Sequence, residues 1–240
     1  GGPIHELSQN IINKVQNRFD KDYKPRDDEG ILKRYSDITQ VDMSKGNWLV
    51  LSSANYFLDD AKDLCEIQGW YYQFKGRNSI PLKLLMALNN WEAWRKDAQL
   101  NHLEIKNIYE YLGSHVLPGF QKGKTLHSDT KYLMRDCRAE HGLVTDSVWY
   151  EAFEGLDPMT ETYIRNMRAN GEMINKNPRI IMSTIHGAKG GEADKVLLMQ
   201  DITNAALETF SHDPDELHRL FYTGATRAKR ELHVLDPKNF

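Results

Sequence analysis

Apolar and polar residues follow two different patterns along this chain. Near the N-terminus, a compact apolar run at residues 48–52 precedes a segment with helical periodicity at residues 55–68. Gly69 follows as a helix stop, and residues 70–74 form an aromatic-rich run. A strand, a helix and a second strand in this order are typical of an open α/β sheet.

The same strand pattern returns near the C-terminus. Three strand-like apolar runs occur there, at residues 180–184, 196–199 and 232–235. Between the last two, residues 213–229 carry the clearest helical signature of the chain, because Asp213 is a natural N-cap, proline follows it, and Glu216 completes a capping box. An amphipathic helix over residues 4–19, a loop over 20–30 and a short strand over 31–38 are predicted as well.

The middle of the chain shows helical signals and no clear strand. Five helices are predicted, at residues 81–96, 101–113, 130–141, 147–153 and 157–171. A helical block between two α/β segments indicates an insertion into one parent domain. We therefore predict a discontinuous α/β domain of residues 1–78 and 178–240, with a helical subdomain of residues 79–177.

Composition narrows the class of protein. The 240 residues are 40% apolar and 27% charged, with a net charge of −3, so any phosphate binding depends on local basic residues. The two cysteines, Cys65 and Cys137, have no paired spacing, which argues against disulfides and a zinc site and fits a reducing, cytoplasmic compartment. No apolar run approaches the ~20 residues of a membrane span, and no histidine–carboxylate set has metal spacing.

Two stretches hold residues suited to chemistry. On the helix at residues 213–229, Arg227 falls beside Leu220 at the border of the apolar stripe, whereas Arg219, Thr226 and Arg230 fall on the far side. A guanidinium held in this way suits a phosphate, but a snorkelling arginine or a salt bridge gives the same spacing. The stretch 186–192 holds three glycines and Lys189 after a buried strand, where ligands often bind, although a simple connection between strands also fits.

A second glycine-rich stretch, residues 119–125, resembles a phosphate-binding P-loop. It has three residues between the first glycine and the Gly-Lys-Thr where a P-loop has four, and no strand precedes it. A small kinase using Lys124 would need that strand, so we interpret this stretch as a basic surface loop.

The two C-terminal stretches resemble motifs V and VI of superfamily 1 DNA helicases of the UvrD type. Residues 184–192 (TIHGAKGGE) resemble the pattern Thr-Leu-His-x-x-Lys-Gly-x-Glu, and residues 219–228 (RLFYTGATRA) resemble Arg-Leu-x-Tyr-Val-x-x-Thr-Arg-Ala. Residues 50–55 lie where motif IV should be, and residues 3–8 resemble the segment after motif III. The resemblance implies a RecA-like parallel sheet with helices on both faces.

The resemblance also implies roles for single residues. Arg227 would reach the γ-phosphate of ATP as the catalytic arginine finger, and Glu192 would contact the ribose, with Gly190 beside it in the nucleotide site. Thr184, His186 and Lys189 would face single-stranded DNA and couple it to the ATP site. The arginine would act only when two motor lobes close, which links hydrolysis to movement along the strand.

Two departures from the family pattern limit this assignment. Motif IV usually carries a tyrosine that stacks the adenine and an arginine that contacts the γ-phosphate, whereas Ser52 and Ser53 occupy those positions here. The first motor lobe, with its P-loop and the acidic motif that holds Mg²⁺, is missing, so ATP and Mg²⁺ are expected in the full-length parent and neither is held by this fragment alone. The runner-up function is a non-catalytic nucleic-acid- or protein-binding module derived from a helicase lobe. Whether the helical insertion binds duplex DNA or a protein partner stays open.

Overall fold

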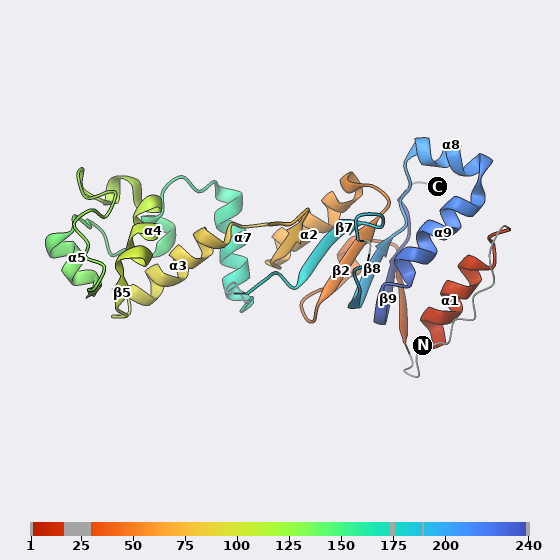
Figure 1. The fold of residues 1–240 in the computed structure, drawn as a ribbon, viewed down its shortest axis with the longest axis horizontal. Coiled ribbons are helices and arrows are strands. Elements are labelled where there is room, and N and C mark those ends of the chain that lie inside the picture. Colours follow the sequence, from red (N-terminus) through yellow and green to blue (C-terminus); the bar gives the residue numbers. More distant parts are fainter. Residues whose placement is uncertain (1, 17–29, 173–175, 189, 239–240) are drawn as a thin grey trace. The chain divides into compact units, whose positions relative to one another are not determined.

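The chain folds into two compact units. The computed structural model describes residues 2–16, 30–172, 176–188 and 190–238. Unit 1 is made of residues 1–79 and 178–240, and unit 2 is made of residues 80–177 (Figure 1). None of the described helices is long and apolar enough to cross a lipid bilayer.

Unit 1 is built on one seven-stranded sheet. Its strands are β1 (Ile31–Tyr35), β2 (Trp48–Ser52), β3 (Tyr72–Phe74), β4 (Arg77–Asn78), β7 (Ile180–Thr184), β8 (Ala193–Met199) and β9 (Ala228–Leu235). Their order is β1-β9-β8-β2-β7-β3-β4, and every neighbouring pair is parallel except the β3–β4 hairpin. All five residues of β2 are buried, as expected for a central strand of a parallel sheet with both faces covered. The predicted α/β, RecA-like fold class is confirmed.

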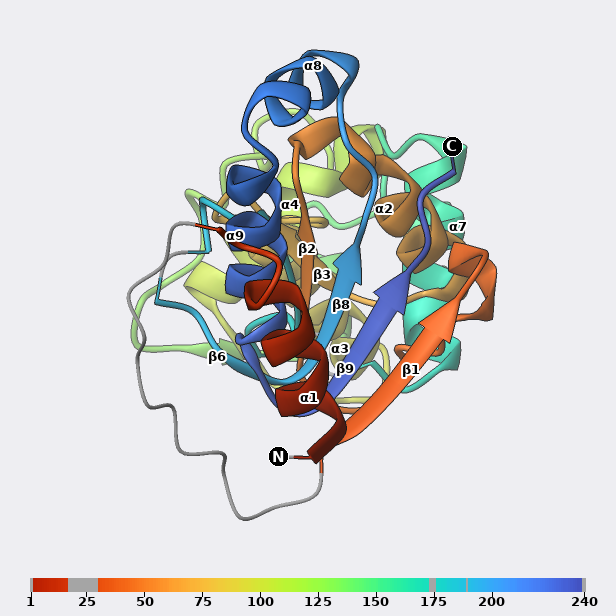
Figure 2. The same cartoon turned by 90° about the vertical axis from the view of Figure 1, so that its right-hand side faces the viewer.

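Helices α1 (Gly2–Ile12) and α9 (Pro214–Ala225) cover one face of the sheet side by side (Figure 2). The strands present a continuous apolar row to them, because Leu49, Val196 and Leu232 are direct neighbours in register. Phe221 of α9 is buried against this row. This packing fixes α9, which carries the second of the two motif-like stretches.

The other face of the sheet meets the segment that follows β2. A 3₁₀ turn, η2 (Asn55–Leu58), leads into α2 (Asp59–Gln68), which lies on the opposite side of the sheet from α1 and α9 (Figure 2). Gly69 ends α2 with a left-handed φ of 73°, a conformation that glycine adopts without steric cost. The predicted strand–helix–strand unit is therefore confirmed.

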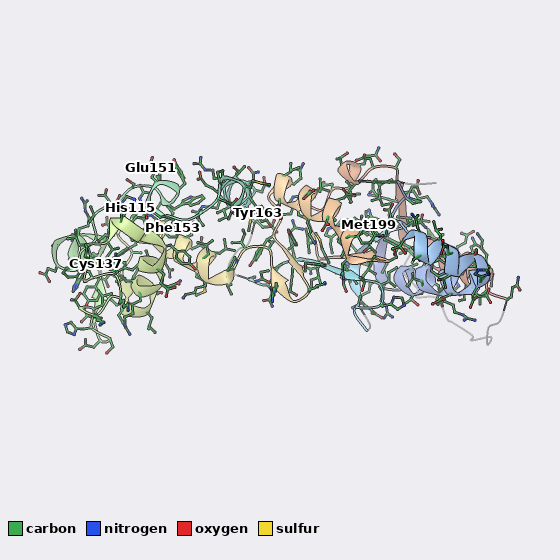
Figure 3. All side chains as sticks on the ribbon, turned by 90° about the horizontal axis from the view of Figure 1, so that it is seen from above. His115, Cys137, Glu151, Phe153, Tyr163 and Met199 are labelled. Atoms are coloured by element: carbon green, nitrogen blue, oxygen red, sulfur yellow. The ribbon has the colours of Figure 1, made fainter. Side chains whose placement is uncertain are left out.

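Unit 2 is mainly helical. Its helices are α3 (Leu82–Trp94), α4 (His102–Leu112), η3 (Gly113–His115), α5 (Met134–Glu140), α6 (Trp149–Ala152) and α7 (Pro158–Ala169). The predicted capping box of Asn101 and Glu104 is present at the start of α4. The core contains Trp91, whose ring meets Phe153 edge-on at 6.1 Å, and the buried Cys137 (Figure 3).

The prediction that the middle block has no strands was wrong in one detail. Two short strands, β5 (Leu100–Asn101) and β6 (Lys131–Tyr132), pair antiparallel there. Each has two residues, too few for an alternating pattern to show in the sequence. The stretch 119–125 consists of turns between helices with no strand leading into it, so the P-loop reading is excluded by the fold as well.

Three helix predictions also need correction. Helix α1 ends at Ile12 where residues 4–19 were predicted, and residues 17–19 lie outside the described residues. Helix α8 (Asn204–His212) was not predicted; it buries none of its residues and so lacks a strong apolar stripe. Helix α9 ends at Ala225 and not at residue 229, because β9 begins at Ala228 and pairs with β8 from that residue.

Candidate functional site

The turn after β7 is held by its own hydrogen bonds. The backbone N–H of Gly187 donates to the Thr184 hydroxyl at 3.0 Å, and the N–H of Ala188 donates to the Thr184 carbonyl at 3.0 Å. A side chain at Gly187 would place its Cβ 2.8 Å from the Ser183 hydroxyl, so the tight turn needs glycine here. Thr184 therefore has a structural role in shaping this turn.

The turn packs closely against α9. Ile185 is buried in the core beside Phe221 and Ala225. A Cβ on Gly224 would lie 2.7 Å from Cδ1 of Leu198 and 3.5 Å from Cδ1 of Ile185. The absence of a side chain at Gly224 thus lets the C-terminal end of α9 approach both β8 and the turn.

Two carboxylates at the N-terminus of α9 fix its start. Asp213 accepts a hydrogen bond from the N–H of Asp215 at 3.1 Å, so the predicted N-cap is confirmed. Asp215 is only 8% exposed, and its carboxylate accepts from the N–H of Gln16 at 2.8 and 2.9 Å. The segment after α1 is thereby tied to α9. The predicted capping role of Glu216 does not appear among the described contacts, and Glu216 lines a cavity instead.

Arg227 lies in the two-residue connection between α9 and β9. Its N–H donates to the carbonyl of Gly224 at 3.2 Å, and its carbonyl accepts from the N–H of Ala193 at 3.1 Å. Its backbone is therefore fixed by the helix on one side and by β8 on the other. Its Nε is buried and has no hydrogen-bond partner among the described residues. An unsatisfied buried donor costs free energy, so this atom marks a place where a ligand oxygen would be stabilising.

A cavity of about 400 Å³ opens beside Arg227. It is lined by Ile185, His186, Phe210, Glu216, Arg219, Leu220, Thr223 and Arg227. Two arginines and one glutamate give the lining a net charge of +1 with a neutral histidine. The structure therefore brings together two predicted site residues, His186 and Arg227, in a cavity suited to an anion.

Arg219 was predicted on the side of the helix away from the apolar stripe, and it is exposed in the structure. It nevertheless lines the same cavity as Arg227. Arg219 and Thr223 of α9 thus reach the cavity together with Arg227. Residues 219 and 223, four apart on α9, share one face of the helix, whereas Arg227 reaches the cavity from the connection after the helix.

The remaining predicted nucleotide contacts lie elsewhere. Glu192 lines a second cavity of about 500 Å³, and its carboxylate pairs with Nζ of Lys229 at 3.7 Å. Gly190 is exposed, with a φ of +83° and open space where a side chain would be. Lys189 lies outside the described residues. Glu192 nevertheless directly precedes Ala193, whose N–H binds the carbonyl of Arg227, so their backbones are adjacent.

The two serines in the motif IV position are engaged with the backbone. Ser52 is fully buried and donates to the carbonyl of Ala54 at 2.7 Å. Ser53 donates to the carbonyl of Asp201 at 2.7 Å. Both hydroxyls thus hold the segment after β2 in place.

Comparison with known families identifies the C-terminal part of the chain. Residues 154–237 match the family model of the UvrD-like helicase C-terminal domain. This range contains every residue that lines the cavity at Arg227. A comparison with curated proteins gives no match. We conclude that residues 154–237 are similar to the UvrD-like helicase C-terminal domain, which is consistent with a C-terminal helicase lobe.

Proposed function

We propose that this chain is the second motor lobe of an ATP-dependent DNA helicase or translocase and that Arg227 is its arginine finger. The observation that carries the proposal is the buried, unpartnered Nε of Arg227 in a cavity with net positive charge. The backbone of Arg227 is held by Gly224 and Ala193 and its Nε is buried, so the base of its guanidinium has a defined place before any ligand arrives. Such preorganisation is what electrostatic stabilisation of a transition state requires.

The proposed chemistry of Arg227 is charge stabilisation. A guanidinium placed against a transferring phosphoryl group stabilises the charge on its oxygens and contributes roughly 10³–10⁵ in rate in other phosphate-hydrolysing enzymes. ATP and Mg²⁺ would be held mainly by a first motor lobe with a P-loop. We therefore expect no ATP hydrolysis by this chain alone.

The turn after β7 would link this chemistry to DNA. His186 lines the cavity with Arg227 and is exposed, so it is available to single-stranded DNA and to the phosphate site together. Thr184 would act by holding the turn through its bond to Gly187. Lys189 would contact the DNA. Gly190 would let the nucleotide come close to the backbone. Glu192 would contact the ribose once its ion pair with Lys229 opens.

ATPase assays with single-stranded DNA test the proposal. This chain alone is expected to be inactive, whereas the chain joined to a first motor lobe is expected to hydrolyse ATP. In the joined protein, Arg227→Ala should lower kcat by roughly 10³ with DNA binding retained. Arg230→Ala is the matched control, because Arg230 is 74% exposed and pairs only loosely with Asp194, at 4.0 Å. DNA-stimulated hydrolysis by the chain alone, or a fully active Arg227→Ala protein, would rule the proposal out.

A second function is favoured by the serines after β2. Ser52 and Ser53 bond to backbone carbonyls and offer neither an aromatic ring nor a positive charge to a nucleotide. Serines without contacts to a nucleotide are expected in a helicase lobe that no longer hydrolyses ATP. Such a lobe would act as a non-catalytic binding module for nucleic acid or protein. In that case the joined protein would bind DNA and show no ATPase activity even with Arg227 intact.

A further inference from the structure

We propose that Arg219 is a second phosphate ligand and that Arg219 and Arg227 together bind one polyphosphate chain in the cavity beside α9. The inference rests on the proposed function of Arg227. It adds a second positively charged side chain, which the motif IV position does not offer. Ser53, which stands there, is occupied by the carbonyl of Asp201. A second positive charge at this site would come from another element, and Arg219 of α9 is one that lines the cavity.

The placement of the two arginines favours an extended anion. Arg219, Thr223 and Arg227 line one side of the cavity at intervals of four residues. From Arg219 to Ala225, the last residue of α9, the helix rises about 9 Å, and Arg227 follows two residues later. A single phosphate is short compared with this distance, whereas a chain of phosphates carries negative charge along such a length.

The walls of the cavity strengthen the interaction. Ile185 is 2% exposed, and Leu220 and Phe210 line the cavity with it. An apolar wall lowers the effective dielectric constant on that side of the cavity, so that an arginine–phosphate contact beside it is stronger than in open solvent.

Arg219 has to be shared between a ligand and an existing partner. Its guanidinium lies 4.0 Å from the carboxylate of Asp215, and half of its side chain is exposed, 50%. Asp215 itself is already occupied by the N–H of Gln16. An ion pair of this length and exposure contributes little to stability, so the pair with Asp215 by itself would not keep Arg219 from a phosphate.

Glu216 provides a test with the opposite sign. It lines the same cavity and is the one carboxylate in that lining among the described residues. Its negative charge opposes anion binding. Neutralising Glu216 should therefore strengthen binding, and a gain of binding cannot result from a misfolded variant.

Binding of inorganic tripolyphosphate to this chain, measured by calorimetry at low salt, tests the inference. Arg219→Gln and Arg227→Gln should each weaken binding by about tenfold, the loss typical of one charge-assisted hydrogen bond. Glu216→Gln should strengthen it, and Arg230→Gln should leave it unchanged, since Arg230 is exposed and outside the cavity. A short oligothymidylate, tested in parallel, distinguishes nucleotide phosphates from a DNA backbone.

The outcomes separate this inference from the proposed function. If Arg219→Gln binds tripolyphosphate like the unmodified chain while Arg227→Gln does not, the role of Arg219 is refuted and that of Arg227 stands. If the oligothymidylate and not tripolyphosphate depends on both arginines, the cavity belongs to the DNA track and the inference fails. If tripolyphosphate does not bind at all, the inference fails, and the ATPase assay on the joined protein still decides the role of Arg227.

Discussion

Gly224 is the residue that allows α9 to reach the turn after β7. A side chain there would meet Cδ1 of Leu198 at 2.7 Å, closer than carbon atoms pack. The geometry of the cavity thus depends on a position with no functional group. The sequence marks Gly224 only as one small residue within an apolar stripe, because close approach between two elements is set by tertiary packing and not by local pattern.

Replacing Gly224 with valine is expected to destabilise unit 1 by about 2 kcal/mol, since overpacking a filled core costs about 1–3 kcal/mol. The free energy of unfolding in urea measures this change. In a Leu198→Val background, which removes the clashing Cδ1 methyl, the same substitution should cost less. Equal costs in both backgrounds would show that Leu198 is not the residue that Gly224 accommodates.

Arg219 shows the limit of prediction at the scale of residues. A helical wheel placed Arg227 at the border of the apolar stripe, but the helix ends at Ala225, and the wheel did not show that Arg219 and Arg227 line one cavity. The family resemblance assigned Arg227 to the ATP site and His186 to DNA, and in the structure both line one cavity. Phe210 escaped prediction because its helix, α8, buries no residue.

At the scale of elements, one carboxylate ties α1 to α9. Asp215 is buried and accepts the N–H of Gln16 through both oxygens. Asp215→Ala leaves that N–H unsatisfied and is expected to cost about 2 kcal/mol, within the range for a hydrogen bond to a charged group. Hydrogen exchange should then speed up at Gln16 more than at Tyr35, which lies in β1. Unchanged exchange at Gln16 would contradict the role of Asp215.

A second polar link crosses strands β1, β9 and β8 on the face away from α1. The ring of His233 is 3% exposed; Nδ1 lies 2.9 Å from the Tyr35 hydroxyl and Nε2 lies 3.0 Å from a carboxylate oxygen of Glu231. Glu231 in turn pairs with Lys195 at 3.4 Å. Burial lowers the pKa of His233 below its usual value, against the opposing effect of Glu231. In the folded protein His233 is therefore neutral near pH 7.

This lowered pKa predicts a pH dependence of stability. The unfolded histidine, with a pKa of about 6.5, binds protons more readily than the folded one. The contribution of His233 is therefore complete above pH ~6.5 and is lost as the pH falls below that value. His233→Gln should flatten the decrease in unfolding free energy between about pH 7.5 and 5.5, whereas the exposed His212→Gln should keep it. An unchanged slope in His233→Gln would contradict the assignment.

Element prediction succeeded where burial is strong and local. The apolar runs of β2, β7 and β8 and the capped helices α4 and α7 were all recognisable. The end of α9 was not, because pairing between Ala193 and Ala228, far apart in the chain, decides where the helix gives way to a strand. Tertiary contacts of this kind leave no trace in the local pattern of residues.

At the scale of the whole molecule, the chain leaves unit 1 after β4 and returns to it at β7, and β3 lies between these two strands in the sheet. The N–H of Ser79 donates to the carbonyl of Tyr72 at 2.8 Å, and Tyr72 pairs in register with Ile180. Ser79 and the start of β7 are thus two ladder spacings apart, about 10 Å. The core of α1, α9 and the sheet contains only residues of unit 1.

Unit 1 should therefore fold without unit 2. Replacing residues 80–177 with about six glycine and serine residues, which span roughly 13 Å as a flexible chain, is expected to give a protein with one cooperative unfolding transition. It should bind tripolyphosphate as the intact chain does, because every residue that lines the cavity at Arg227 belongs to unit 1. Arg227→Gln in the shortened protein is the control for binding at the same site. A shortened protein that folds cooperatively but loses binding would show that unit 2 shapes the phosphate site, and one that fails to fold would show that unit 1 depends on its insertion for stability.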